Sequence, residues 1–300
     1  MQMISYAQNH EDVLLRRAFP DRDAGFYLDI GAAHPVIGSV TKHFYDRGWR
    51  GVNIEPLTTY YEQHATELPR DVNLQVCLSN REGGATLYQT PDYLGWATMS
   101  AEQAAAYRRE GVAVVESPVA LTTLARVCEQ HANQHIDFLK IDVEGLEREV
   151  LEGGDWKQWR PRIVVVEAVA PNTMIATHDH WEDVLIKADY VPGLFDGINR
   201  WYVRAEDREL LPALSTPVNI FDDFIPYHHH HRAELLHASI HEMQAHIDDL
   251  AGRLERTRLE LASYQEMGPT AMAIARRLHA FSVRHGRLAG LCKRLLRRAG

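Results

Sequence analysis

The fold is decided by the segment from Phe26 to Glu55, which reads FYLDIGAAHPVIGSVTKHFYDRGWRGVNIE. It predicts two buried strands, at 26–30 and 51–54, separated by a turn and a helix, which is the spacing of one parallel β-α-β unit. A glycine turn that leads into a helix brings backbone N–H groups close to a ligand. An acidic residue at the tip of the next strand, here Glu55, is placed to accept hydrogen bonds from the hydroxyls of a ribose. The segment therefore predicts a nucleoside cofactor site.

The turn after the first strand narrows the choice of cofactor. A dinucleotide fingerprint has the form G-x-G-x-x-G, which lets the pyrophosphate approach a helix N-terminus. Here the turn reads GAAHPVIG from Gly31, so the middle glycine is missing and His34-Pro35 stands where the phosphates would lie. This disfavours a nicotinamide-dependent oxidoreductase and favours S-adenosylmethionine, bound by Asp29, Gly31 and Glu55. An ordinary turn with a capping acid is the alternative explanation of Asp29.

Composition sets the class of protein. A chain of 300 residues with 45% apolar content is long enough for one large α/β domain and an appendage. Its 3 cysteines show no C-x-x-C spacing, which argues against a disulfide framework and a zinc site. No basic leader with an apolar core and no spanning run of about 18–20 apolar residues is present, so we expect a cytoplasmic protein.

Further apolar runs alternate with helical segments. Strands are expected at Val72–Leu78, Ile136–Ile141 and Ile163–Val166, and Tyr190–Phe195 and Arg200–Val203 flank a turn that makes them antiparallel neighbours. Strands that alternate with helices predict a parallel sheet. The expected fold is therefore α/β and class I Rossmann-like, with a mostly parallel seven-stranded sheet and a closing antiparallel hairpin.

Two details complete the expected sheet. The segment 85–89 is expected to pair back onto 72–78 as a hairpin. Because ligands bind beyond the carboxyl ends of parallel strands, Ser79 and Asp142 are also predicted to bind the cofactor, and Glu167 follows the neighbouring strand.

These motifs together resemble the FkbM family of S-adenosylmethionine-dependent methyltransferases over residues 4–204. Five segments carry the resemblance in family order: Ser5-Tyr6-Ala7-Gln8 with Glu11-Asp12, Tyr27 to Ala32, Gly48 to Pro56, Phe138 to Gly145, and Asp196 to Arg200. The resemblance implies a Rossmann-like methyltransferase that O-methylates sugars, polysaccharides or polyketide-type metabolites. His34-Pro35 departs from the smaller Gly-rich turn of many members and is similar to relatives linked to surface polysaccharides.

The catalytic candidates follow from the chemistry of methyl transfer. A sulfonium methyl is already electrophilic, so the enzyme has to align the attack and remove a hydroxyl proton. Asp142 is the first candidate for the base or a metal ligand, Glu144 is the second, and His34 competes because its ordinary pKa lies near neutrality. Asp142 and Glu167 form a candidate site for a divalent cation such as magnesium. Helix caps or salt bridges would explain these carboxylates without function, and a packed turn would explain His34.

The resemblance also indicates contacts to the acceptor. The candidates are Gln8, Glu11, Asp196, Asn199 and Arg200, and the loop residues Trp96, Thr98 and Ser100 could contact cofactor or acceptor. Solvent-facing polar residues and a simple turn would produce a similar pattern.

The C-terminal third differs in character. We expect a methyltransferase domain over 1–211, a Pro- and His-rich linker over 212–233, a coiled coil over 234–267 and a basic amphipathic helical tail over 270–300. The histidine run 228–231 could bind metal, although solvated linker histidines are more common. Nine positions alternate by four and three residues: Leu236, Ile240, Met243, Ile247, Leu250, Leu254, Thr257, Leu261 and Tyr264. This heptad pattern predicts a homo-oligomer through 236–264, and a single amphipathic helix folded onto the domain is the alternative.

The tail over 271–300 has eight Arg or Lys residues and no Asp or Glu, in a chain of net charge −9. Its leucines recur at helical spacing among the cations, a pattern typical of helices on anionic membrane surfaces. We therefore expect a peripheral position on the inner membrane face and no nucleic-acid partner.

Three functions remain open at this point. The leading one is an O-methyltransferase that acts on a sugar hydroxyl of a glycan or polysaccharide. The alternatives are a coiled-coil scaffold or chain-length device at the membrane, with methylation secondary, and O-methylation of a small-molecule metabolite.

Overall fold

The computed structural model describes residues 2–132, 135–170, 173–266 and 268–284. The chain divides into two compact units, Met1–His230 and His231–Gly300.

The first unit is built on a seven-stranded sheet with the order β10-β11-β9-β8-β2-β3-β4. Its strands are β2 (Phe26–Ile30), β3 (Arg50–Ile54), β4 (Val72–Leu74), β8 (Phe138–Ile141), β9 (Ile163–Glu167), β10 (Tyr190–Phe195) and β11 (Asn199–Arg204). Neighbouring strands from β4 to β9 pair in parallel, whereas β11 pairs antiparallel with both β9 and β10. The predicted class I fold with its closing hairpin is confirmed.

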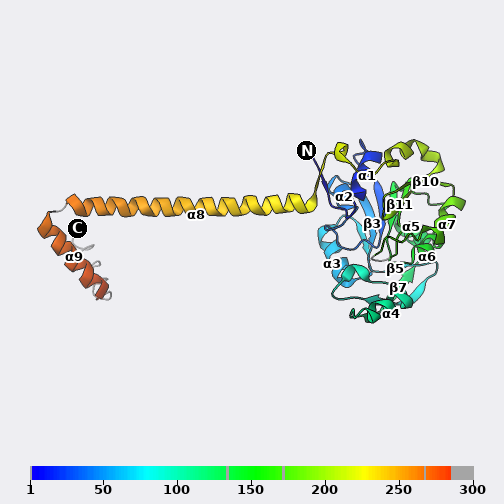
Figure 1. Ribbon diagram of the computed structural model, residues 1–300, viewed down its shortest axis with the longest axis horizontal. Coiled ribbons are helices and arrows are strands. Elements are labelled where there is room, and N and C mark those ends of the chain that lie inside the picture. Colours follow the sequence, from blue (N-terminus) through cyan, green and yellow to red (C-terminus); the bar gives the residue numbers. More distant parts are fainter. Residues whose placement is uncertain (1, 133–134, 171–172, 267, 285–300) are drawn as a thin grey trace. The chain divides into compact units, whose positions relative to one another are not determined.

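Two cores cover the faces of this sheet, because successive side chains of a strand point to opposite sides. Leu28 and Leu139 pack in one core with α5, α6 and α7, while Tyr27 and Phe138 pack in the other with α1, α2 and η3. Figure 1 shows β3 and β11 between α2 on one side and α5 to α7 on the other. The helices are α1 (Glu11–Ala18), α2 (Lys42–Asp46), α3 (Thr58–Glu67), α5 (Leu124–His131), α6 (Glu147–Glu152), α7 (Glu182–Lys187), η2 (His178–His180), η3 (Ala205–Leu214) and η4 (Ile220–Asp222).

A second sheet of three strands carries a correction. It has the order β5-β7-β6, with β5 (Cys77–Leu78), β6 (Gly83–Gln89) and β7 (Val115–Thr122), and it is accompanied by η1 (Leu94–Trp96) and α4 (Ala101–Arg109). The expected hairpin between 85–89 and 72–78 is wrong, because β5 and β6 both pair with β7 instead. The expected strand 72–78 is divided between the two sheets, as β4 and β5. The sequence analysis did not predict β7, because it contains Pro118 and proline usually argues against a central strand.

Residues 212–226, which the sequence assigns to a linker, belong to the first unit. β12 (Phe224–Pro226) pairs in parallel with β1 (Met3–Ser5). Arg17 of α1 forms an ion pair with Asp222 at 2.6 Å. Prolines are compatible with this segment because it consists of short 3-10 turns and an edge strand.

The C-terminal region is helical. α8 (Tyr227–Glu266) is one continuous helix of 40 residues, and α9 (Pro269–Arg284) begins at the break expected from Gly268-Pro269. The eight apolar heptad residues other than Thr257 are 45–71% exposed. Five of the eight tail cations (Arg287, Lys293, Arg294, Arg297 and Arg298) and Cys292 lie outside the described residues, whereas Cys77 and Cys128 are buried free thiols. Among the described helices, none combines the length and apolar character that crossing a bilayer requires.

Candidate active site

A cavity of about 730 Å³ opens beyond the carboxyl ends of β2, β3, β8 and β9. This volume lies within the range of about 300–1,000 Å³ that is typical of ligand pockets. The position is the point where the chain order reverses on either side of β2, which is where open α/β sheets bind their ligands. The lining includes Gln8, Gly31, Glu55, Asp142 and Glu167.

Gly31 is required by the close approach of two strand ends. Its φ of +72° lies in the left-handed region, and a Cβ at this position would lie 1.7 Å from the carbonyl oxygen of Asp142. No larger residue fits between the turn after β2 and the end of β8. The glycine thus brings the two loops together at the floor of the cavity.

Glu55 follows β3 and is 5% exposed. Its Oε2 accepts a hydrogen bond from the Ala33 N–H and its Oε1 accepts one from the Leu57 N–H, both at 2.8 Å. These bonds fix the carboxylate while each oxygen keeps a second acceptor site, which is the requirement for binding two ribose hydroxyls. Burial raises the pKa of Glu55 to about 7.

Lys140 is a site residue to which the sequence analysis gave no role. Its Nζ donates to the Gly31 carbonyl at 2.6 Å and lies 3.4 Å from Asp29 and 3.5 Å from Asp142. Burial lowers the pKa of this ammonium, but Asp29 and Asp142 outweigh it and raise the pKa above its ordinary value. The only sign in the sequence that Lys140 belongs to the site is its position two residues before Asp142, which puts both side chains on the same side of an extended strand.

Asp29 therefore acts through Lys140 and does not line the cavity. It is 1% exposed and accepts a hydrogen bond from the Thr41 hydroxyl at 3.2 Å. Its carboxylate holds the lysine, and the lysine holds the Gly31 peptide against the cavity.

Three carboxylates meet in the cavity. Carboxylate oxygens of Asp142, Glu144 and Glu167 all lie within 4.8 Å of one another. Burial, with Asp142 and Glu147 next to it, raises the pKa of Glu144 to about 8. Burial and the neighbouring carboxylates also raise the pKa of Glu167. Like charges at this distance favour either a shared proton or a bound cation.

The backbone of Glu144 is held in an unusual conformation. Its φ is +54°, which is uncommon for a residue with a side chain. The buried Thr98 hydroxyl donates to the Glu144 carbonyl at 3.0 Å and so fixes this peptide from the segment after η1, which is bridged to β6 at Tyr88. Thr98 is therefore a structural support of the carboxylate cluster.

The remaining wall next to Glu55 is apolar and aromatic, with Leu57, Tyr60, Val76 and Cys77. Such a wall suits a nucleobase, and Glu55 beside it suits the ribose. The cavity thus fits an adenosine-type cofactor, and the three carboxylates line the same cavity.

The comparison with known families decides the assignment. Residues 29–192, more than half of the chain, match the model of the methyltransferase FkbM domain. The chain belongs to the FkbM methyltransferase family. This FkbM protein is therefore an S-adenosylmethionine-dependent methyltransferase, and its cavity edge from Gly31 to Glu55 has the donors and acceptors to bind that cofactor.

Among the solved structures to which the chain is similar are methyltransferases. One is a TehB-like S-adenosylmethionine-dependent methyltransferase from Corynebacterium glutamicum, 8% identical, with a TM-score of 0.36 over 65% of this chain and 87% of that chain. Another is an O-methyltransferase from Bacillus cereus in complex with SAH, 10% identical, with a TM-score of 0.28 over 65% of this chain and 80% of that chain. No curated protein gives a significant match. The assignment of the FkbM protein rests on the family match.

Two predicted site residues lie beside the cavity without lining it. The Nδ1 of His34 accepts the N–H groups of Val36 and Ile37 at 3.0 Å, so this imidazole closes its own turn. Ser79 donates its N–H to the Thr122 carbonyl at 3.0 Å, and its neighbours in β5 line the cavity instead.

The predicted acceptor residues are divided by the structure. Gln8 lines the cavity, whereas Glu11, Asp196 and Asn199 form a hydrogen-bonded network outside its lining. The Asn199 side-chain amide donates to Glu11 at 2.8 Å, and Asp196 accepts the indole N–H of Trp201 at 2.8 Å. This network joins α1 to the turn between β10 and β11.

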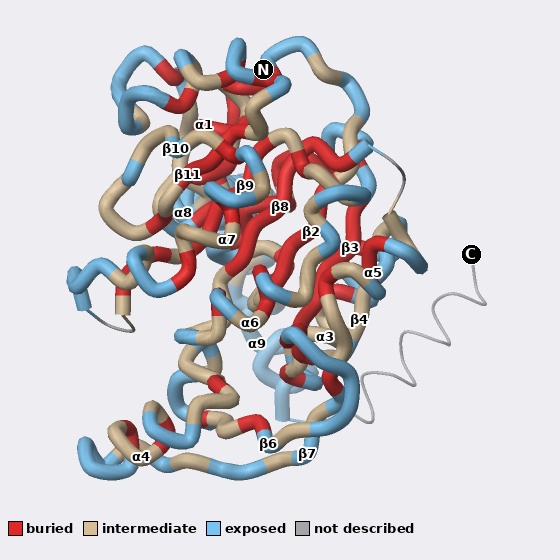
Figure 2. The backbone as a smooth tube through the Cα atoms, turned by 90° about the vertical axis from the view of Figure 1, so that its right-hand side faces the viewer, coloured by how far each residue is buried: buried red, intermediate tan, exposed pale blue. Residues whose placement is uncertain are grey.

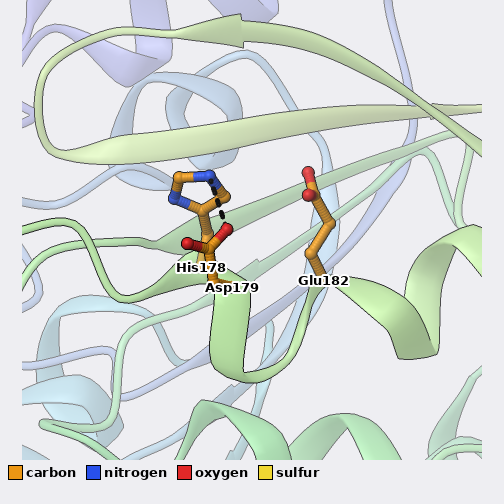
Figure 3. A group of neighbouring side chains, drawn as sticks. All are labelled: His178, Asp179 and Glu182. Atoms are coloured by element: carbon orange, nitrogen blue, oxygen red, sulfur yellow. Dashed lines mark ion pairs between the residues drawn. The ribbon is translucent and has the colours of Figure 1, made fainter.

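Arg200 pairs with Glu182, which belongs to a second cluster together with His178 and Asp179, shown in Figure 3. His178 Nε2 lies 3.5 Å from Asp179, and ligand-type atoms of all three residues lie within 4.8 Å of one another. Glu182, however, already pairs with Arg200 at 3.2 Å and accepts the Tyr202 hydroxyl at 2.9 Å. Because a cation would have to compete with Arg200, this cluster is explained by the anchoring of α7 to β11.

Proposed function

We propose that this FkbM protein transfers the methyl group of S-adenosylmethionine to a sugar hydroxyl of a glycan or polysaccharide. The observation that carries the proposal is the carboxylate cluster of Asp142, Glu144 and Glu167 in the same cavity as the cofactor edge at Gly31 and Glu55. A sugar hydroxyl is a weak acid, so its attack needs a nearby proton acceptor or a cation.

The residues divide the work as follows. When bound, S-adenosylmethionine supplies an electrophilic methyl group. Glu144 in its ionised form takes the proton of the acceptor hydroxyl. Its raised pKa of about 8 makes that form a stronger base than an ordinary carboxylate, and the ionised fraction grows as the pH rises toward 8. Asp142, paired with Lys140, and Glu167 orient the acceptor oxygen or hold a divalent cation such as magnesium beside it.

Substitutions separate these roles. Asp142→Asn keeps the side-chain shape and removes a cation ligand, and Glu144→Gln removes the base, so each is expected to lower turnover by about a hundredfold or more. Activity that EDTA abolishes and magnesium restores supports the cation. Unchanged turnover in Glu144→Gln at neutral pH would show that Glu144 is not the general base and would leave Asp142 or His34 as the candidate.

The acceptor is identified by mass spectrometry of glycans from cells with and without the gene. A mass loss of one methyl group per repeat in cells without it is the expected result. An unmethylated glycan in both cell types, together with methyl transfer to a small metabolite in vitro, would favour the metabolite alternative. Absence of any transfer would favour the membrane scaffold.

The C-terminal helices support a second part of the proposal. The exposed heptad face of α8 over 236–264 joins copies of the protein, and the basic tail over 271–300 places the oligomer on an anionic membrane at its inner face. Several weakly bound tails on one oligomer act together and bind more tightly than one.

A further inference from the structure

The lobe formed by β5, β6, β7 and α4 carries a stack of three aromatic rings, of which Trp96 lines the cavity. Tyr93 stacks on Trp96 with a centroid distance of 4.4 Å and an angle of 12°, and Trp96 contacts Tyr107 at 5.4 Å and 25°. Figure 2 shows that this lobe, labelled by α4, β6 and β7, is much less buried than the central strands β2, β3 and β8. The two cores of the seven-stranded sheet are formed by other residues and do not include this ring stack.

The rings are held in place before any ligand binds. Tyr107 is 2% exposed and supports Trp96 from α4. The Thr90 hydroxyl donates to the Tyr93 carbonyl at 2.6 Å, and the Trp96 N–H donates to the same carbonyl at 2.9 Å. A ligand that stacks on this surface therefore loses little free energy in ordering it.

The outer end of the stack is open. Tyr93 is 50% exposed, and Trp96 lines the cavity together with Glu144 and Glu167. Thr98, two residues after Trp96, is hydrogen-bonded to the Glu144 carbonyl, so the aromatic surface and the carboxylates are fixed relative to each other.

This combination matches the two surfaces of a pyranose. One face of such a ring presents C–H groups, which are attracted to the electron-rich face of an aromatic ring. Its edge presents hydroxyls, which need polar partners such as Gln8 and the carboxylates that line the same cavity.

We propose that the exposed ring of Tyr93, with Trp96 stacked against it, forms a stacking subsite for a pyranose ring of the acceptor and that this subsite selects sugars over other hydroxyl compounds. The inference rests on the proposed glycan O-methylation and adds the residues that recognise the acceptor.

The test uses the full-length protein saturated with S-adenosylhomocysteine and a panel of methyl pyranosides as probes. Saturation-transfer NMR is expected to show contact mainly at the ring C–H protons of one face. Tyr93→Leu and Trp96→Leu are expected to weaken binding by about threefold to tenfold, the range for one aromatic contact. Tyr93→Phe keeps the ring and serves as the matched control with near-native binding.

The readouts distinguish this inference from the proposed function. Cofactor affinity measured by calorimetry has to remain unchanged in Tyr93→Leu, because Tyr93 is not among the residues that line the cavity. An unchanged circular dichroism spectrum in every variant shows that the fold persists. If sugars are methylated with the same KM by native protein and Tyr93→Leu, the stacking subsite is wrong and glycan methylation stands. If no sugar is methylated, the proposed function fails, and pyranoside binding then decides the subsite alone. Absence of pyranoside binding to the native protein, or binding unaffected by both Leu substitutions, overturns the inference.

Discussion

Replacement of Lys140 by methionine tests the central electrostatic argument. The substitution keeps the apolar stem but removes the ammonium that lies 3.4 Å from Asp29 and 2.6 Å from the Gly31 carbonyl oxygen. Asp29 is 1% exposed and would be left without its cation. Loss of one partner from a buried ion pair costs about 3–5 kcal/mol. We therefore expect Lys140→Met to lower the free energy of unfolding by that amount.

The measurement is urea unfolding followed by tryptophan fluorescence. All 6 tryptophans lie at or before residue 201, so the signal reports the first unit alone. Lys42→Met is the matched control, because Lys42 pairs with Asp46 at 2.5 Å on the surface and such pairs contribute less than about 1 kcal/mol.

A double-mutant cycle completes the test. Asp29→Asn removes the orphaned charge, so Lys140→Met combined with Asp29→Asn is expected to be more stable than the sum of the single losses by about 1–3 kcal/mol. A loss below about 1 kcal/mol in Lys140→Met, or strictly additive losses, would refute the argument that Lys140 neutralises a buried carboxylate.

Three further predictions concern the carboxylates and the C-terminal helices. Burial raises the pKa of Glu144 from 4.5 to about 8, so the folded state holds a proton that the unfolded state releases between these values. Stability is therefore expected to fall as pH rises from about 4.5 to 8, and Glu144→Gln should reduce that slope in urea unfolding at several pH values; an unchanged slope contradicts it. Ile247→Asp on the heptad face should make the protein monomeric by light scattering, whereas Leu259→Asp, 63% exposed against 56% for Ile247 but outside the heptad positions, should not; a monomeric native protein rules out the oligomer. Arg276→Glu with Arg277→Glu should reduce flotation with phosphatidylglycerol liposomes at low salt, because each cation contributes about 1 kcal/mol, and binding indifferent to these changes and to salt would count against a membrane role.

The sequence by itself determined the frame of the first unit. Strand ends are short local patterns, so Gly31 and Glu55 could be placed at one sheet edge from their spacing alone. The same holds for Asp142 and Glu167, which the structure brings together because parallel strands end at a common edge. The helix break at Gly268-Pro269 was also local and could be read directly.

Only the tertiary structure decided which of these groups share an environment. Lys140 lies between two carboxylates because β2 and β8 are neighbours in the sheet. In the chain, 111 positions separate Lys140 from Asp29 and 109 separate it from Gly31, so no local pattern could pair them. Burial then sets the pKa of Glu144, and no residue pattern reports burial. For His34 the sequence suggested a catalytic base, but in the structure its Nδ1 accepts a backbone N–H of its own turn. The pairing of β6 with β7 was missed because strand partners are chosen by long-range packing, which a local pattern does not contain.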